Sequence, residues 1–196
     1  MIIYLDTETT SLSPGNVCQL SYIMQNGNKV RGKNFYFSVD QMDYFAEQVH
    51  GLSIEKLKKL SNGKTLKDNA REILEDFSNA SLLVAHNATF DINYLRHDFE
   101  QIGYEFPEKE VFCTMKNTMC ICKIPKAKGN GYKYPKLNEM CAFFGVDDQV
   151  VLHYTKKAFG DSLGFHDARF DTMAMFLAIT KGKEFYKDLQ VLNKYL

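Results

Sequence analysis

The sequence predicts an α/β fold: a mixed β-sheet, in which an antiparallel meander is continued by parallel strands, flanked by α-helices. Three observations predict it. The chain opens on an apolar run, Ile2–Leu5, that leads directly into two carboxylates, as expected of a buried strand. An Asn26-Gly27 pair, which favours the tight turn of a hairpin, separates two further strand-like stretches. Helical patterns then alternate with two more short apolar runs.

The individual elements follow from local patterns along the chain. Strands are expected at residues 2–5, 17–25, 30–39, 82–85 and 111–114. Helices are expected at residues 53–60, 65–77, 91–101, 137–144 and 167–180. Ser53 and Thr65 are typical N-cap residues for the first two helices, and Gly103 and Gly145 end two of the others. No linker between these elements is long enough to suggest a second domain.

A lysine-rich stretch, residues 116–136, differs in character from the rest. It holds six lysines and no Asp or Glu, and its second half predicts a loop. Two interpretations are open. The lysines could contact phosphates while Tyr132 or Tyr134 stacks on single-stranded bases, or the stretch could be a solvated loop.

Two more segments have a weaker pattern. Residues 147–164 predict an irregular segment, which could measure substrate length or form a plain surface loop. The tail, residues 181–196, carries apolar side chains at roughly helical spacing. We expect the tail to be helical and to pack onto its own domain; a docking helix or a dimer contact is the alternative.

Length and composition indicate one globular domain, residues 1–196, with 45% hydrophobic and 24% charged residues. Because 24 basic and 24 acidic residues cancel, a nucleic-acid partner must be held by a local patch or by metal ions. No apolar run is long enough to span a membrane. An irregular set of five cysteines and the lack of a secretory leader predict a cytoplasmic location. Oligomeric state is left open.

Two carboxylates end the first strand. Side chains on a strand alternate between faces, so Asp6 and Glu8 point the same way. Burying two carboxylates side by side is costly unless a cation lies between them, and open α/β sheets bind ligands at strand ends. The pair therefore suggests a divalent-metal site. The simpler alternative is a solvated strand terminus.

Two later segments supply further carboxylates at element boundaries. Asp91 follows the apolar run 82–85 and falls in the first turn of a helix, where the helix dipole favours negative charge. His166 precedes the last predicted helix, and Asp171 lies on it. Each has a structural alternative: Asp91 as a favourable helix N-terminal residue, and Asp167 as an N-cap beside an exposed loop histidine.

Together these residues resemble a known family. They form three motifs in a fixed order: Asp6-x-Glu8, His86-Asn-x-x-Phe-Asp91 and His166-x-x-x-x-Asp171. The order and spacing are similar to those of the DEDD superfamily of 3′→5′ exonucleases, and the last histidine matches its DEDDh branch. That branch includes the proofreading epsilon subunit of bacterial replicative DNA polymerase and oligoribonuclease. Ser11 departs from the glycine common at its position.

The resemblance implies a fold, a chemistry and a set of site residues. The fold is a ribonuclease H-like sheet. The activity is metal-dependent hydrolysis at the 3′ end of single-stranded DNA or RNA, releasing nucleoside 5′-monophosphates. Two divalent ions, Mg²⁺ or Mn²⁺, are bound by four carboxylates: Asp6, Glu8, Asp91 and Asp171. His166 acts as general base. The implied substrate contacts are Thr9, Leu12, Asn87 and Phe90.

Other interpretations are kept. The same fold could be a non-catalytic or weakly catalytic nucleic-acid-binding module that docks on a DNA polymerase. An endonuclease of the ribonuclease H type would share the carboxylates, although the spacing of His166 disfavours it. Asp167 is a rival ligand to Asp171, because the two are four residues apart on one helix.

Overall fold

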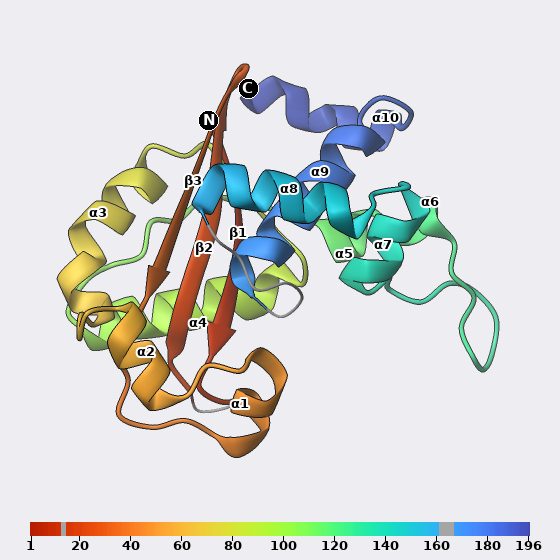
Figure 1. The fold of residues 1–196 in the computed structure, drawn as a ribbon. Coiled ribbons are helices and arrows are strands. Elements are labelled where there is room, and N and C mark those ends of the chain that lie inside the picture. Colours follow the sequence, from red (N-terminus) through yellow and green to blue (C-terminus); the bar gives the residue numbers. More distant parts are fainter. Residues whose placement is uncertain (13–14, 161–166) are drawn as a thin grey trace.

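The computed structural model describes residues 1–12, 15–160 and 167–196. Its sheet has the order β3-β2-β1-β4-β5 (Figure 1). The strands are β1 (Ile2–Thr9), β2 (Val17–Asn26), β3 (Lys29–Tyr36), β4 (Leu82–Ala85) and β5 (Glu110–Cys113). The first three pair antiparallel, whereas β4 pairs parallel to β1 and β5 pairs parallel to β4. The mixed sheet predicted from the sequence is therefore confirmed.

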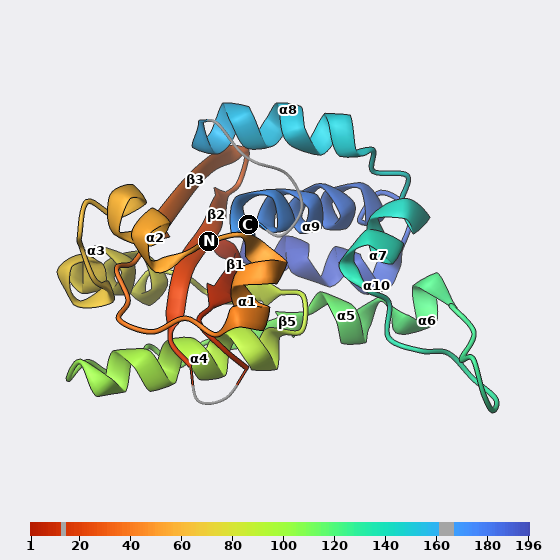
Figure 2. The ribbon, with the colours of Figure 1, turned by 60° about the horizontal axis from the view of Figure 1, so that its bottom comes forward.

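Helices lie on both faces of this sheet (Figures 1 and 2). The longer ones are α3 (Leu66–Ser78), α4 (Ala88–Gln101), α8 (Asp148–Phe159) and α9 (Ala168–Gly182). The shorter ones are α1 (Tyr44–His50), α2 (Ile54–Leu60), α5 (Thr114–Asn117), α6 (Met119–Cys122), α7 (Leu137–Phe143), α10 (Lys187–Gln190) and the 3₁₀ helix η1 (Val191–Tyr195).

The two faces of the sheet have separate cores. Ile2 and Tyr4 of β1 pack in a cluster with α7, α8 and α9. Ile3 and Leu5 of the same strand pack in a second cluster with α3 and α4. A continuous apolar strand is what a sheet covered on both faces requires, because every side chain of the strand is buried on one face or the other.

The prediction of an irregular segment at residues 147–164 is wrong over most of its length, and its last part, residues 161–164, lies outside the described residues. Residues 148–159 form α8, whose N-cap Asp147 accepts a hydrogen bond from the backbone nitrogen of Gln149. At the other end of α8, Phe159 lies against Gly32 of β3, where an added Cβ atom would stand 2.6 Å from the ring. The helix depends on this packing against β3 and α9, which local sequence does not reveal.

The C-terminal tail, residues 181–196, is mostly helical and partly buried. Leu189 of α10 and Leu192 of η1 are buried in the cluster under α9, and the N-terminal amino group of Met1 donates to the backbone oxygen of Tyr195 at 2.9 Å. The tail thus packs onto its own domain.

In the part of the chain that the structure describes, no helix combines the length and the apolar character needed to cross a membrane.

Candidate metal centre and active site

Strand β1 presents its side chains alternately to the two faces of the sheet. Tyr4 lies in the cluster under α9, whereas Leu5 lies in the cluster formed with α3 and α4. Asp6 and Glu8 continue the row of Tyr4, so both carboxylates lie on the α9 face. The register of β1 against β2 shifts directly after Glu8. A bulge of this kind bends the strand and redirects the side chains that follow.

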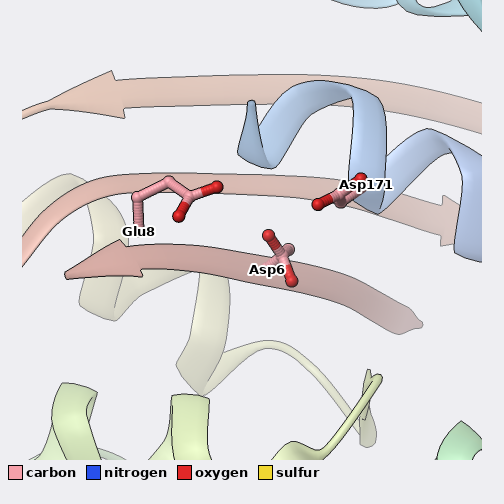
Figure 3. Close-up of side chains that lie close together, drawn as sticks. All are labelled: Asp6, Glu8 and Asp171. Atoms are coloured by element: carbon pink, nitrogen blue, oxygen red, sulfur yellow. The ribbon is translucent and has the colours of Figure 1, made fainter. Parts of the chain in front are cut away.

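The third carboxylate comes from α9, which packs across β1 and β2. Asp171 lies in the first turn of this helix. One carboxylate oxygen from each of Asp6, Glu8 and Asp171 lies within 4.8 Å of the other two. Figure 3 shows the three side chains directed into a common space between β1 and α9. Among the described residues, this is the one cluster of His, Cys, Asp or Glu side chains with such spacing.

Burial, together with neighbouring negative charge, raises the pKa of each of the three carboxylates. Burial, followed by the charges of neighbouring carboxylates, raises the pKa of Asp6 well above its ordinary value. Burial and then Asp171 raise the pKa of Glu8 to about 9. Burial and then Asp167 raise the pKa of Asp171 to about 7. Hard divalent cations such as Mg²⁺ and Mn²⁺ prefer carboxylate oxygens and relieve this repulsion. The donor set therefore fits a divalent ion.

Asp91 reaches the same end of β1 from α4, on the other face of the sheet. Its buried carboxylate is 3% exposed. Its Oδ1 accepts hydrogen bonds from the backbone nitrogen of Thr7 at 3.1 Å and from Thr7 Oγ1 at 2.8 Å. Burial raises the pKa of Asp91 to about 7, although these hydrogen bonds lower it. Asp91 lies outside the group of three oxygens, but its charge contributes to the raised pKa of Asp6.

Asp167, the rival ligand, is engaged elsewhere. It is the N-cap of α9, and its carboxylate accepts hydrogen bonds from Nε and Nη2 of Arg169 at 2.9 and 2.6 Å. Gln19 of β2 donates to the same carboxylate at 3.0 Å. Burial alone would raise the pKa of Asp167, but these hydrogen bonds outweigh burial and lower it. Asp167 thus positions the start of α9, and Asp171 is the residue that faces Glu8.

A cavity of about 540 Å³ opens beside Glu8, which is within the range of about 300–1,000 Å³ typical of small-ligand sites. Three of the four predicted substrate-binding residues line it: Thr9, Leu12 and Phe90. The fourth, Asn87, does not line this cavity; it is the N-cap of α4 in a left-handed conformation with φ 70°. Its role in substrate binding stays a prediction. His166 lies outside the described residues, so its role also stays a prediction.

Leu12 stands at the edge of this cavity, with 82% of the residue exposed. Its loop is held in place by Tyr94 of α4, whose hydroxyl donates to the backbone oxygens of Ser11 and Leu12. The ring of Tyr94 in turn packs on the ring of Phe90, with centroids 4.6 Å apart. These contacts hold the backbone that carries Leu12 at the cavity mouth, while the apolar side chain itself is mostly exposed to water.

One wall of the cavity was missed by reasoning from the sequence. Helix α1 contributes Phe45, Val49 and His50, and Phe45 is 74% exposed. Sequence pattern predicts no helix or strand at residues 40–50. A signal was present, because Asp43 precedes Tyr44 and Phe45, and Asp43 is an N-cap whose carboxylate accepts from the backbone nitrogen of Phe45 at 2.8 Å. Helices this short are decided by packing rather than by pattern.

The metal-free protein is expected to lose stability as the pH rises. Asp6, Glu8 and Asp171 have raised pKa values in the fold. The folded state therefore holds protons that the unfolded chain releases from about pH 4 upward. Thermal unfolding in EDTA should show a melting temperature that falls from pH 5 to pH 8. Mg²⁺ or Mn²⁺ at 100 times its Kd should add about 2.7 kcal/mol, or roughly 5–10 °C, at pH 8. An equal melting temperature with and without metal at pH 8 would contradict a metal site.

Comparisons with known proteins agree with this geometry. A model of the family described as Exonuclease matches residues 3–153. The DNA polymerase III epsilon subunit of Rickettsia felis is 30% identical over 153 residues, covering 74% of this chain and 63% of that protein. The epsilon subunit of Escherichia coli strain K12 is 27% identical over 157 residues, covering 74% of this chain and 61% of that protein. The match thus spans less than two thirds of these curated relatives.

Solved structures show the same fold at lower sequence identity. A structure of exonuclease I superposes with a TM-score of 0.73 at 16% identity, covering 98% of this chain and 43% of that one. The nuclease domain of 3′hExo, a DEDDh family member bound to rAMP, gives a TM-score of 0.62 at 13% identity, covering 94% of both chains. The family model covers well over half of the sequence and includes Asp6 and Glu8 of β1. This chain belongs to the Exonuclease family.

Proposed function

We propose that this chain is a metal-dependent 3′→5′ exonuclease of the DEDDh type that acts on single-stranded DNA or RNA. One observation carries the proposal: Glu8 belongs both to the cluster of three carboxylates and to the lining of the cavity. If the 3′ end of a nucleic-acid strand fills the cavity, its terminal phosphodiester would lie next to the carboxylates. Family membership supports the reaction class, and the DEDDh neighbour supports the fold of that branch.

The proposed division of labour follows from the positions of the side chains. Asp6, Glu8 and Asp171 would hold divalent ions, with Asp91 as the fourth carboxylate. A pair of such ions supplies charge neutralisation at phosphorus and lowers the pKa of water. His166 would accept the proton of the attacking water. Of the two carboxylates on α9, Asp171 faces Glu8 and would bind the metal, whereas Asp167 would anchor the start of the helix.

The cavity would hold the terminal nucleotide. Thr9 follows the bulge in β1 and lines the cavity. Leu12 would separate the last two bases, because Tyr94 holds its loop at the cavity mouth. Phe90 would form the floor beneath the base. The released product would be a nucleoside 5′-monophosphate.

His166→Ala is expected to lower the rate by about 10²–10⁴-fold at neutral pH, which is the usual contribution of a positioned general base. Single-turnover hydrolysis in Mg²⁺ measures the effect. The rate of the unaltered chain should also fall as the pH drops below about 6.5, where an ordinary histidine becomes protonated. A variant with unchanged rates would show that His166 does not take the proton.

The cellular setting is also a proposal. The relatives are named as subunits of DNA polymerase III, which supports a DNA polymerase as partner and proofreading as the role. The five cysteines are all free and four of them are buried, which supports a reducing cytoplasm.

The experiment is a time course on matched 5′-labelled single-stranded DNA and RNA, each also with a blocked 3′ end, in Mg²⁺, Mn²⁺ or EDTA. A metal-dependent ladder that shortens from the free 3′ end and stops at the block is the expected result. The faster substrate identifies the class of nucleic acid. Internal cleavage of blocked strands would contradict the exonuclease and favour an endonuclease. Binding without cleavage would favour a non-catalytic docking module.

A further inference from the structure

A basic arm, defined here as residues 123–134, projects from the body of the molecule beyond α6 and α7 (Figures 1 and 2). It is an ordered hairpin, because Pro125 and Tyr132 form an antiparallel bridge. The backbone nitrogen of Lys126 donates to Gly131 at 3.2 Å, and that of Lys133 donates to Ile124 at 2.9 Å. The arm thus keeps a defined shape while burying little of its own surface.

The charge on this arm is of one sign. The lysine-rich stretch that contains it has six lysines and no acidic residue, in a chain whose net charge is zero. Lys126 and Lys128 are exposed at the tip and have no acidic partner among the described residues. Lys133 at the base is different, because it pairs with Glu139 of α7 at 2.5 Å. Lys123, at the start of the arm, is also exposed and has no acidic partner among the described residues, so unpaired positive charge runs from the base of the arm to its tip.

The base of the arm is held at the same end of the sheet as the carboxylates, the C-terminal end of the parallel strands β1 and β4. His86 follows β4 directly, and its Nε2 lies 3.0 Å from the backbone oxygen of Pro135, just beyond the arm. Its Nδ1 lies 2.9 Å from Thr114 Oγ1. Five residues after His86, Asp91 accepts hydrogen bonds from Thr7 of β1, the residue between Asp6 and Glu8. The segment after β4 therefore contacts the residue next to the arm through His86 and the strand that carries Asp6 and Glu8 through Asp91.

We propose that the basic arm binds the sugar–phosphate backbone of the substrate strand upstream of its 3′ end. This inference rests on the proposed function. A nucleic-acid strand whose last nucleotide fills the cavity must leave the molecule at the end of the sheet where the carboxylates lie. The arm starts at that same end. Single-stranded nucleic acid is the partner whose charge and chemistry match it, because lysines contact phosphates and exposed aromatic rings stack on bases. Tyr132 and Tyr134, which are 40% and 51% exposed, supply such rings.

The test compares a Lys126→Gln/Lys128→Gln variant with a matched control, Lys58→Gln/Lys59→Gln. The control lysines are exposed on α2, which lies on the opposite side of the molecule from the arm in Figure 2. Each chain is measured on two substrates, a 20-nucleotide single strand and the p-nitrophenyl ester of thymidine 5′-monophosphate. The ester has no upstream strand. Binding of the labelled 20-mer in EDTA is followed by fluorescence anisotropy over a range of salt concentrations.

The arm variant should show a weaker salt dependence of binding. Each phosphate contact to a single strand contributes about 0.7 to the slope of log K against log salt, so two lost contacts lower it by about 1.4. Between 50 and 200 mM salt, the unaltered chain should then lose about 7-fold more affinity than the variant. The ratio of kcat/KM for the 20-mer to kcat/KM for the ester should fall in the arm variant and stay constant in the control.

Three outcomes would overturn the inference. One is a salt slope that does not change in the arm variant. Another is an equal change in the control, which would reveal a diffuse charge effect. The third is an equal loss on the 20-mer and the ester, which would show that the arm acts on the catalytic centre. If the unaltered chain hydrolyses neither substrate, the proposed function fails, while the anisotropy measurement still decides whether the arm binds the strand.

Discussion

Asp6→Asn is expected to lower exonuclease activity by at least about 10³-fold, because ion binding at the reacting phosphate contributes several kcal/mol and each 1.36 kcal/mol is tenfold in rate. Asparagine keeps the shape of the side chain and removes its charge. Asp6 faces Glu8 and Asp171 in the space between β1 and α9. The variant should therefore fail to bind Mn²⁺ with the affinity of the unaltered chain, as measured by isothermal titration calorimetry.

The same substitution should leave the fold intact. Burial and then Asp91 and Asp171 raise the pKa of Asp6, so its charge is unfavourable in the metal-free protein. Melting in EDTA at pH 8 should occur at an equal or higher temperature in the variant. Asp188→Asn on α10, an exposed position, is the control and should leave activity and Mn²⁺ binding unchanged. Retained turnover in Asp6→Asn would remove Asp6 from the metal centre.

The second large effect separates two carboxylates on one helix. Asp171→Asn should lower activity by at least about 10²-fold and weaken Mn²⁺ binding, since one of the proposed metal ligands is lost. Asp167→Asn should instead lower the free energy of unfolding by about 3–5 kcal/mol, the usual cost of breaking a buried ion pair. Its partner Arg169 would keep a buried charge, because the two side chains are 8% and 11% exposed.

Two measurements distinguish the variants. Denaturant unfolding should show the stability loss in Asp167→Asn, while Asp171→Asn in EDTA is as stable as the unaltered chain or more so. The rise in melting temperature caused by Mn²⁺ should persist in Asp167→Asn and be reduced in Asp171→Asn. The reverse pattern would make Asp167 the ligand and Asp171 a structural residue.

Much of the fold could be predicted because its signals are local. The apolar runs at β1 and β4 are buried strands, and Asn26-Gly27 forms the hairpin turn between β2 and β3. Helix α8 could not be predicted in this way. Its β-branched residues, such as Val150 and Val151, have lower helix propensity, and contacts with α9 and β3 stabilise it.

For the site, local pattern alone indicates which carboxylates are available and that Asp6 and Glu8 share a face, because strand alternation is a local property. The other features of the site depend on how the helices pack on the sheet. The packing of α9 on that face brings Asp171 next to Asp6 and Glu8, while Asp167 accepts a hydrogen bond from Arg169. Asp91 comes from α4 and accepts a hydrogen bond from Thr7. The position of Phe45 in the cavity wall also depends on tertiary packing. These contacts join residues far apart in the chain, and such contacts depend on the packing of whole elements rather than on any local pattern.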